Sequence, residues 1–158
     1  MNKTLINLSL AASIIMMTMP ANAKTEFNGD IINGIPVITK LDTADLAPAK
    51  RHEFYFQSSQ NSLGQHWHVP VIVIKGVTDG KKILLNSSIH GNELNGLQII
   101  HEIINDLNPA ELKGTVVAVP GANPAGMLGA TRSIPVRDDN DMQTNLNRVF
   151  PGKEHGNV

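Results

Sequence analysis

The feature that most constrains the fold is a strand, helix, strand order in the middle of the chain. Residues 82–87 (Lys-Ile-Leu-Leu-Asn-Ser) and residues 115–119 are short apolar runs of the kind found in buried strands. Between them, residues 92–107 carry apolar side chains at helical spacing: Leu97, Ile100, Ile104 and Leu107. Apolar strands joined by a helix favour parallel pairing with a right-handed crossover. The order predicts an α/β fold, a mixed sheet with helices on its faces.

Neighbouring segments extend this sheet. Residues 66–75 are rich in Val and Ile, and residues 77–80 have turn composition, so we expect residues 66–75 and 82–87 to form a hairpin. Residues 51–57 have the aromatic content of another strand. The rest of residues 24–62 shows only a weak pattern, and the chain beyond Pro120 is typical of loops.

Composition excludes several classes of function. The 158 residues are 41% hydrophobic and 17% charged, with a formal net charge of -1, which is typical of a globular protein and argues against a nucleic-acid partner. The chain has no cysteine, which excludes disulfides, thiolate metal sites and a thiol nucleophile. Any metal ion must therefore be held by His, Asp or Glu.

The N-terminus has the pattern of a cleaved export signal. Lys3 precedes a largely apolar run over residues 5–19, and Ala21-Asn22-Ala23 then gives a small-x-small cleavage site. The alternative is a membrane anchor, but the run falls short of the ~20 residues that a spanning helix needs. We expect a signal peptide over residues 1–23 and a mature chain from Lys24 that keeps no stable membrane anchor. The protein would be periplasmic in a Gram-negative host and secreted otherwise.

The motif His90-Gly91-Asn92-Glu93 lies where a predicted strand ends and a predicted helix begins. Ligand sites of open α/β sheets lie at the carboxyl ends of strands. A His and a Glu three residues apart across such a turn can direct a ring nitrogen and a carboxylate at one point, and both are good zinc ligands. In the alternative interpretation, Asn92 or Glu93 only favours the helix N-terminus and His90 is incidental.

A second polar motif is Asn145-Leu146-Asn147-Arg148-Val149-Phe150-Pro151-Gly152. Its apolar residues suit a loop that is anchored to a core while Asn147 and Arg148 are presented to a ligand. An arginine in such a loop can bind a substrate carboxylate in bidentate fashion or stabilise an oxyanion. Arg148 could equally be a surface salt-bridge residue.

Together, and in this order, the two motifs resemble the succinylglutamate desuccinylase/aspartoacylase family, which is related to the zinc carboxypeptidases. The resemblance covers roughly residues 69–152 and includes Asn123-Pro124. It implies a zinc-carboxypeptidase-like fold and one Zn²⁺ per complete site, with His90 and Glu93 as metal ligands. It also implies that Asn147 and Arg148 bind the carboxylate end of the substrate.

The resemblance further implies an arginine that polarises the scissile carbonyl. Arg132 has the sequence surroundings expected for it, whereas Arg137 lies nearer the expected spacing to the second motif. We assign this catalytic role to Arg132 and keep Arg137 as the alternative. Many relatives have Asp where Asn145 stands, so a carboxylate behind the metal ligands would be replaced here by an amide.

Part of the implied site has no match in the sequence. The family's third ligand is a His on a later strand, and its general base is a carboxylate later still. His155 is the only downstream histidine, and it lies in a glycine-rich segment rather than on a strand. We therefore expect residues 24–158 to be the N-terminal part of a zinc amidohydrolase or deacylase catalytic domain, with an incomplete fold and the missing groups beyond Val158. His66, His68 and His101 are not expected to join the site.

The resemblance implies an exported zinc-dependent hydrolase that cleaves an amide or ester bond of a carboxylate-bearing N-acyl amino acid. One alternative is a metallocarboxypeptidase that acts on cell-wall or other peptides. An alternative from another class is a truncated, non-catalytic module that only binds carboxylates.

Overall fold

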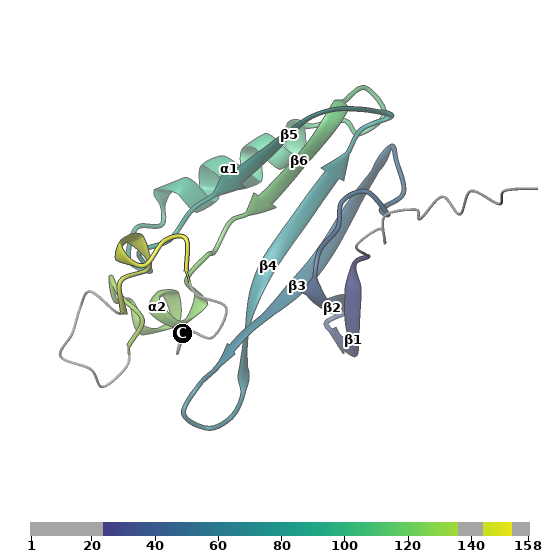
Figure 1. Cartoon of the computed structure of the whole chain (residues 1–158). Helices are drawn as coiled ribbons and strands as arrows, with labels where there is room; N and C mark the ends of the chain where they lie inside the picture. Colours follow the sequence, from purple (N-terminus) through teal and green to yellow (C-terminus); the bar gives the residue numbers. More distant parts are fainter. Residues whose placement is uncertain (1–23, 136–143, 153–158) are drawn as a thin grey trace, which may run out of the picture.

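The computed structural model describes residues 24–135 and 144–152, and these residues form a six-stranded mixed sheet with helices beside it (Figure 1). The order of the strands in the sheet is β1-β2-β3-β4-β6-β5. In chain order the elements are β1 (Glu26–Ile32), β2 (Ile35–Lys40), β3 (Lys50–Gln60), β4 (His66–Lys75), β5 (Thr78–Asn86), α1 (Asn95–Asp106), β6 (Lys113–Val119), α2 (Pro124–Gly129) and the 3-10 helix η1 (Leu146–Arg148). The predicted mixed α/β fold is confirmed.

Strand β4 divides the hydrophobic core into two clusters because successive side chains of a strand point to opposite faces. Ile72 and Ile74 pack with α1 and β6, whereas Val71 and Val73 pack with β2, β3 and the loop after β2. The members contributed by the partner elements are Ile100, Ile104, Val116 and Ala118 in the first cluster, and Ile38, Leu46 and Phe54 in the second. Burial of each large aliphatic side chain contributes roughly 1.5–3 kcal/mol, so α1 is held on the sheet mainly by its two buried isoleucines.

Several predicted elements are confirmed. Strand β4 coincides with residues 66–75, β3 contains residues 51–57, and β6 contains residues 115–119. Strands β5 and β6, which α1 connects, pair in parallel with Leu84 opposite Val117, as the strand, helix, strand order predicted.

The predicted hairpin between residues 66–75 and 82–87 is wrong. Strand β6 lies between β4 and β5, and it pairs antiparallel with the first and parallel with the second. The connection from β4 to β5 crosses the start of β6, where Gly76 N–H donates to the Gly114 carbonyl over 2.9 Å. A Cβ atom at Gly76 would stand only 2.2 Å from the Leu112 carbonyl oxygen, so this crossing requires glycine. The expected turn at residues 77–80 is largely the beginning of β5.

Three further corrections concern the less patterned segments. Residues 24–40 contain β1 and β2, joined at Asn33-Gly34, where both residues have the positive φ of a tight hairpin turn. Helix α1 begins at Asn95 rather than Asn92, because the preceding residues form the turn described below. The chain beyond Pro120, expected to be loop, contains α2, which Pro124 begins and an Asn123 side chain caps.

Within residues 24–135 and 144–152, no helix has the length and apolar character needed to cross a membrane. The predicted signal peptide, residues 1–23, lies outside the described residues.

Candidate metal and carboxylate-binding site

The site lies where the parallel strands β5 and β6 end at the same edge of the sheet. The loops that follow them are joined by two backbone hydrogen bonds, from Ser87 N–H to the Val119 carbonyl (3.1 Å) and from Ala122 N–H to the Ser87 carbonyl (3.0 Å). The turn containing His90 follows β5, and the loop containing Asn123 follows β6. The carboxyl ends of neighbouring parallel strands are the usual place for a ligand site in an α/β sheet, as predicted.

Gly91 allows this turn to pack directly on α2. A Cβ atom at Gly91 would stand 2.0 Å from the Gly126 carbonyl carbon, a distance that only glycine permits. The Gly91 N–H also donates to the Arg132 carbonyl over 3.3 Å. Gly91, which follows the predicted ligand His90, therefore allows both α2 and the backbone of Arg132 to pack against the turn.

Asn123 holds the same turn from the other side. Its side chain is 1% exposed, and its Nδ2 donates to the Ile89 carbonyl over 3.1 Å. Its Oδ1 accepts from the Gly126 N–H over 2.8 Å and so caps α2. One amide thus links the backbone before His90 to the start of α2, a role that Asn-Pro spacing alone did not reveal.

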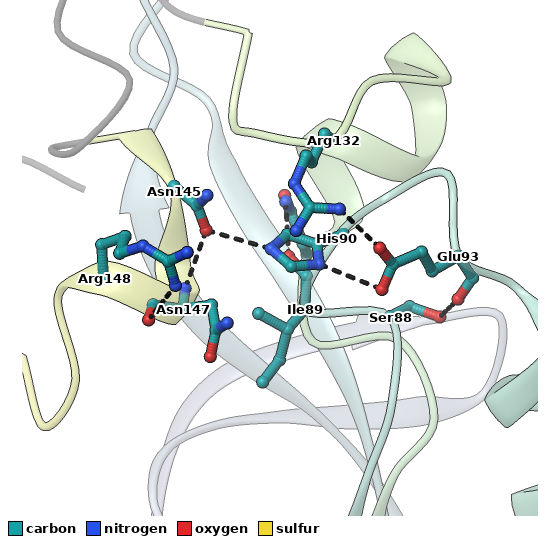
Figure 2. Close-up of polar contacts among 9 residues, drawn as sticks. Ser88, Ile89, His90, Glu93, Arg132, Asn145, Asn147 and Arg148 are labelled. Carbon is teal, nitrogen blue, oxygen red and sulfur yellow. Dashed lines mark hydrogen bonds and ion pairs between the residues drawn. The ribbon is translucent and has the colours of Figure 1, made fainter.

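The side chains of Glu93, Arg132 and Asn145 come together around the His90 ring (Figure 2). The ring is almost fully buried, at 6% exposure, and its Nδ1 lies 3.0 Å from Oε2 of Glu93. Its Nε2 lies 3.1 Å from Oδ1 of Asn145. The other carboxylate oxygen of Glu93, Oε1, accepts a hydrogen bond from Nη1 of Arg132 over 2.6 Å. The structure therefore brings the predicted ligands and the predicted catalytic arginine together.

The hydrogen bonds of Asn145 determine which ring nitrogen carries a proton. Its Oδ1 accepts from the Asn147 backbone N–H over 3.1 Å, and a backbone N–H can only donate, so oxygen rather than nitrogen faces His90. An oxygen acceptor requires a donor, so His90 Nε2 carries a proton. In the neutral ring, Nδ1 then has a lone pair that points at a carboxylate oxygen 3.0 Å away. Two acceptors at that distance need a cation between them, either a proton or a metal ion.

The environment of Glu93 keeps its carboxyl group ionised. The hydrogen bond with His90 holds the pKa of Glu93 below its ordinary value, partial burial opposes that shift, and the hydrogen bond with Arg132 adds to the lowering. Glu93 itself is largely exposed, at 59% of its side chain. It is therefore a solvent-accessible anion at neutral pH, which is the form that binds a metal ion.

The two donors, His90 Nδ1 and Glu93 Oε2, are of the chemical types that bind zinc. Two donors about 2.0–2.2 Å from a tetrahedral zinc stand roughly 3.3–3.6 Å apart. The observed separation of Nδ1 and Oε2 is 3.0 Å, so a small outward movement of the exposed Glu93 side chain would admit the ion. Metal-binding histidines usually donate their other N–H to an oxygen acceptor, and Asn145 provides one. Among the described residues, no group of three or more His, Asp and Glu side chains is arranged to hold a metal ion. A catalytic zinc commonly has three protein ligands.

The predicted carboxylate-binding pair lies on η1, on the Asn145 side of the ring and away from Glu93 (Figure 2). Asn147 and Arg148 are both exposed. Arg148 N–H donates to the Asn145 carbonyl over 2.8 Å, and its Nη1 donates to the Asn147 carbonyl over 3.3 Å. The guanidinium is thus presented to solvent.

The Glu93 carboxylate makes no capping bond to α1. The N-cap of α1 is Leu94, which makes no side-chain capping bond, and the first turn of α1 contains no acidic residue. The carboxylate oxygens of Glu93 instead bond to His90 and Arg132. His101 lines an apolar cavity of about 320 Å³ between α1 and α2, which Glu93 does not line. His66 is bound by Ser58, Gln57 and Gln60.

Two sequence-based alternatives fall outside the described residues, namely Arg137 for the catalytic arginine and His155 as a weak third ligand. Sequence reasoning named His90, Glu93, Arg132, Asn147 and Arg148, and noted Asn145 as an amide in place of a carboxylate. It also indicated that Gly91 lets the backbone approach closely, which the structure confirms, but it missed Asn123 as a structural support of the turn. The Asn-Pro sequence signals a helix cap, but the contact of Asn123 with Ile89 spans 34 residues and leaves no local pattern.

Comparison with known proteins gives a consistent family. Residues 79–158, just over half of the chain, match the family model for the succinylglutamate desuccinylase/aspartoacylase catalytic domain. The chain is 33% identical over 88 residues to the succinylglutamate desuccinylase of Shewanella frigidimarina, which covers 54% of this chain and 23% of that protein.

Solved structures agree. A succinylglutamate desuccinylase/aspartoacylase from Rhodobacter sphaeroides matches 71% of this chain with a TM-score of 0.58 and 28% identity. An aspartoacylase family protein from Mesorhizobium loti matches 83% of this chain with a TM-score of 0.56 and 23% identity, a similarity of fold. The chain covers 34% and 35% of those two proteins, so it spans about a third of their length.

Proposed function

Because the chain belongs to the succinylglutamate desuccinylase/aspartoacylase family, we propose that it contributes two metal ligands and the carboxylate-binding turn of a zinc-dependent hydrolase. The substrate would be a small N-acyl amino acid that carries a carboxylate, and the bond cleaved an amide or ester. The observation that supports this most is the pair formed by His90 Nδ1 and Glu93 Oε2, a ring nitrogen and a carboxylate oxygen 3.0 Å apart at the end of a parallel strand.

The polar side chains around this pair have distinct proposed roles. His90 and Glu93 would hold Zn²⁺, which when bound lowers the pKa of a water ligand and polarises a carbonyl group. Arg132 would place guanidinium N–H groups at the carbonyl oxygen as negative charge develops there. A guanidinium has five N–H donors, so the bond to Glu93 leaves others for a substrate.

The turn η1 would orient the substrate. The Arg148 guanidinium would bind the substrate carboxylate, which suits its planar pair of donors, and the Asn147 amide would contribute a further hydrogen bond. Binding through a carboxylate that does not itself react would fix the reacting carbonyl next to Arg132 and Glu93. This arrangement favours short substrates with a carboxylate near the acyl bond.

Two other functions remain as alternatives. The export pattern of residues 1–23 favours a metallocarboxypeptidase that acts on peptides outside the cytoplasm. The presence of only two donors among the described residues favours a carboxylate-binding module without catalysis. We also propose that the protein is exported. The mass of the protein isolated from the periplasm or the medium tests this, and it should correspond to a chain that begins at Lys24.

A substrate panel tests the proposal. A chain completed with a third metal ligand and a general base is assayed against N-succinyl-L-glutamate, N-acetyl-L-aspartate and short peptides, first with Zn²⁺ and again after treatment with a chelator. We expect zinc-dependent release of an acyl group from an acylated amino acid, and none from His90→Ala. Preferential release of C-terminal residues from peptides would favour the carboxypeptidase. Carboxylate binding that a chelator does not change, with no turnover at any zinc concentration, would favour the binding module.

A further inference from the structure

Asn145 is bonded to both halves of the site. It is 3% exposed and is the N-cap residue of η1. Its carbonyl oxygen accepts from Arg148 N–H, and its Oδ1 accepts from Asn147 N–H. The same Oδ1 lies 3.1 Å from Nε2 of His90, 55 residues earlier in the sequence. The backbone of both proposed carboxylate-binding residues is therefore anchored on the residue whose Oδ1 lies against Nε2 of the His90 ring.

The hydrogen bonds of Asn145 Oδ1 with His90 and with the Asn147 N–H depend on each other, because both depend on the position of this one oxygen atom. A movement of the Asn145 side chain toward or away from His90 changes the acceptor that Asn147 N–H uses, because one oxygen atom serves both donors. A cation on Nδ1 withdraws electrons from the ring, so Nε2–H becomes a stronger donor and its bond to Oδ1 gains charge-assisted character. That bond holds Asn145, and with it η1, more firmly.

We infer that Asn145 is a positioning residue that couples metal binding at His90 to the order of the carboxylate-binding turn η1. The inference rests on the proposed function. Coupling of this kind is reciprocal, so a carboxylate held on η1 would also raise the affinity of the site for the metal. The metal and the substrate carboxylate would thus favour each other without touching a common group.

Asn123 offers a matched control. It is also a buried asparagine, at 1% exposure, that caps a helix and contacts the His90 turn. Its contact, however, is with the Ile89 carbonyl rather than with the His90 ring, and it caps α2 rather than η1. Substitution of Asn123 removes a buried amide of the same kind but leaves the connection between His90 and η1 in place.

The test is residue-resolved hydrogen exchange of the Asn147 and Arg148 amides, measured with and without Zn²⁺ alone. We expect Zn²⁺ to slow their exchange roughly fivefold or more in the wild-type chain. Asn145→Ala should bind Zn²⁺ yet lose this protection, Asn123→Ala should retain it, and Asn145→Asp, which keeps the acceptor and adds charge, should show at least the wild-type effect. Binding of Zn²⁺ itself is followed by calorimetry on the same samples.

The outcomes separate this inference from the proposed function. A wild-type chain that binds no Zn²⁺ contradicts the proposed metal site. Zinc binding without protection of the two amides, or equal protection in Asn145→Ala, overturns the coupling alone. If Asn145→Ala does not fold, Asn145→Asp decides: a folded, zinc-bound Asn145→Asp chain without protection also overturns it.

Discussion

The guanidinium of Arg132 lies 2.6 Å from the carboxylate of Glu93, 39 residues earlier in the chain. The bond uses Oε1, whereas Oε2 faces His90, so the two oxygens of one carboxylate have different partners. Arg132 therefore orients the proposed metal ligand. Its backbone is fixed there by the bond from Gly91 N–H.

Replacement of Arg132 should impair the chemical step. In Arg132→Ala we expect kcat for the hydrolysed acyl amino acid to fall roughly 100-fold, the usual loss when a donor to a developing oxyanion is removed. Steady-state kinetics measure this. Arg51→Ala is the control, because Arg51 also pairs with a glutamate, Glu53, in a different part of the sheet. An unchanged kcat in Arg132→Ala would assign the catalytic role elsewhere, with Arg137 the next candidate.

Arg148→Lys should impair substrate binding instead. Lysine keeps the charge but loses the planar pair of donors, so we expect KM for a carboxylate-bearing substrate to rise roughly tenfold while kcat changes little. The same kinetics on an ester or amide of that substrate, with the carboxylate blocked, provide the control and should show no difference between wild type and variant. A fall in kcat at constant KM is the result that the proposed role does not allow.

Gly91→Ala should destabilise the fold. The added Cβ would overlap the Gly126 carbonyl carbon at 2.0 Å, so α2 must move away from the turn, at a cost of about 3 kcal/mol in the free energy of unfolding. Urea unfolding followed by circular dichroism measures it. Gly129→Ala is the control, because a Cβ there meets its nearest neighbours only at 3.5 Å and should cost far less. Equal stability of the two variants would contradict the close packing of the turn on α2.

Asp45 should make stability depend on pH in the acid range. Hydrogen bonds from the backbone N–H and the hydroxyl group of Thr25 hold the pKa of Asp45 below its ordinary value of 3.8, although partial burial opposes the shift. A depressed pKa stabilises the folded state above the ordinary value, and that contribution disappears as pH falls through the lower folded value.

Unfolding by urea at a series of pH values checks this. We expect Asp45→Asn, which can still accept hydrogen bonds but does not titrate, to lose less stability than wild type between neutral pH and about pH 3. Because Asp45 is exposed, the difference should be small. If the free energy of unfolding fell more steeply with acid in the variant than in wild type, stabilisation of the Asp45 carboxylate by Thr25 would be contradicted.

The elements that were predicted correctly have a strong pattern of apolar residues. The runs in β4 and β6 and the apolar face of α1 are dictated by burial on the sheet, and the parallel pairing of β5 with β6 follows from their order. The hairpin between residues 66–75 and 82–87 was predicted wrongly because the residues between them have turn composition. The glycines that allow the connection from β4 to β5 to cross the start of β6, Gly76 and Gly114, have no distinctive local pattern. Asn33-Gly34 is typical of a hairpin turn between β1 and β2. The strands on either side lack a regular alternation of apolar residues and pair irregularly, so the hairpin was not predicted.

The site was predictable to the extent that its residues lie in short motifs. His90 and Glu93 are three residues apart, and Asn147 and Arg148 are adjacent, so resemblance to a family was enough to name them. The contacts that hold these motifs together were not predictable in the same way. The bonds from Asn123 to Ile89 and from His90 to Asn145 join residues 34 and 55 positions apart, and only the folded chain brings them together.

The proposed function requires His90 and Glu93 to bind one divalent ion together. Isothermal titration of the apo chain with Zn²⁺ tests this most directly, with His90→Ala, Glu93→Gln and the double variant measured beside wild type and Glu53→Gln as a control on a distant carboxylate. We predict stoichiometric binding by wild type and by Glu53→Gln, and loss of affinity by roughly 100-fold or more in each single variant, with little further loss in the double variant. Unchanged zinc affinity in either His90→Ala or Glu93→Gln would contradict the account.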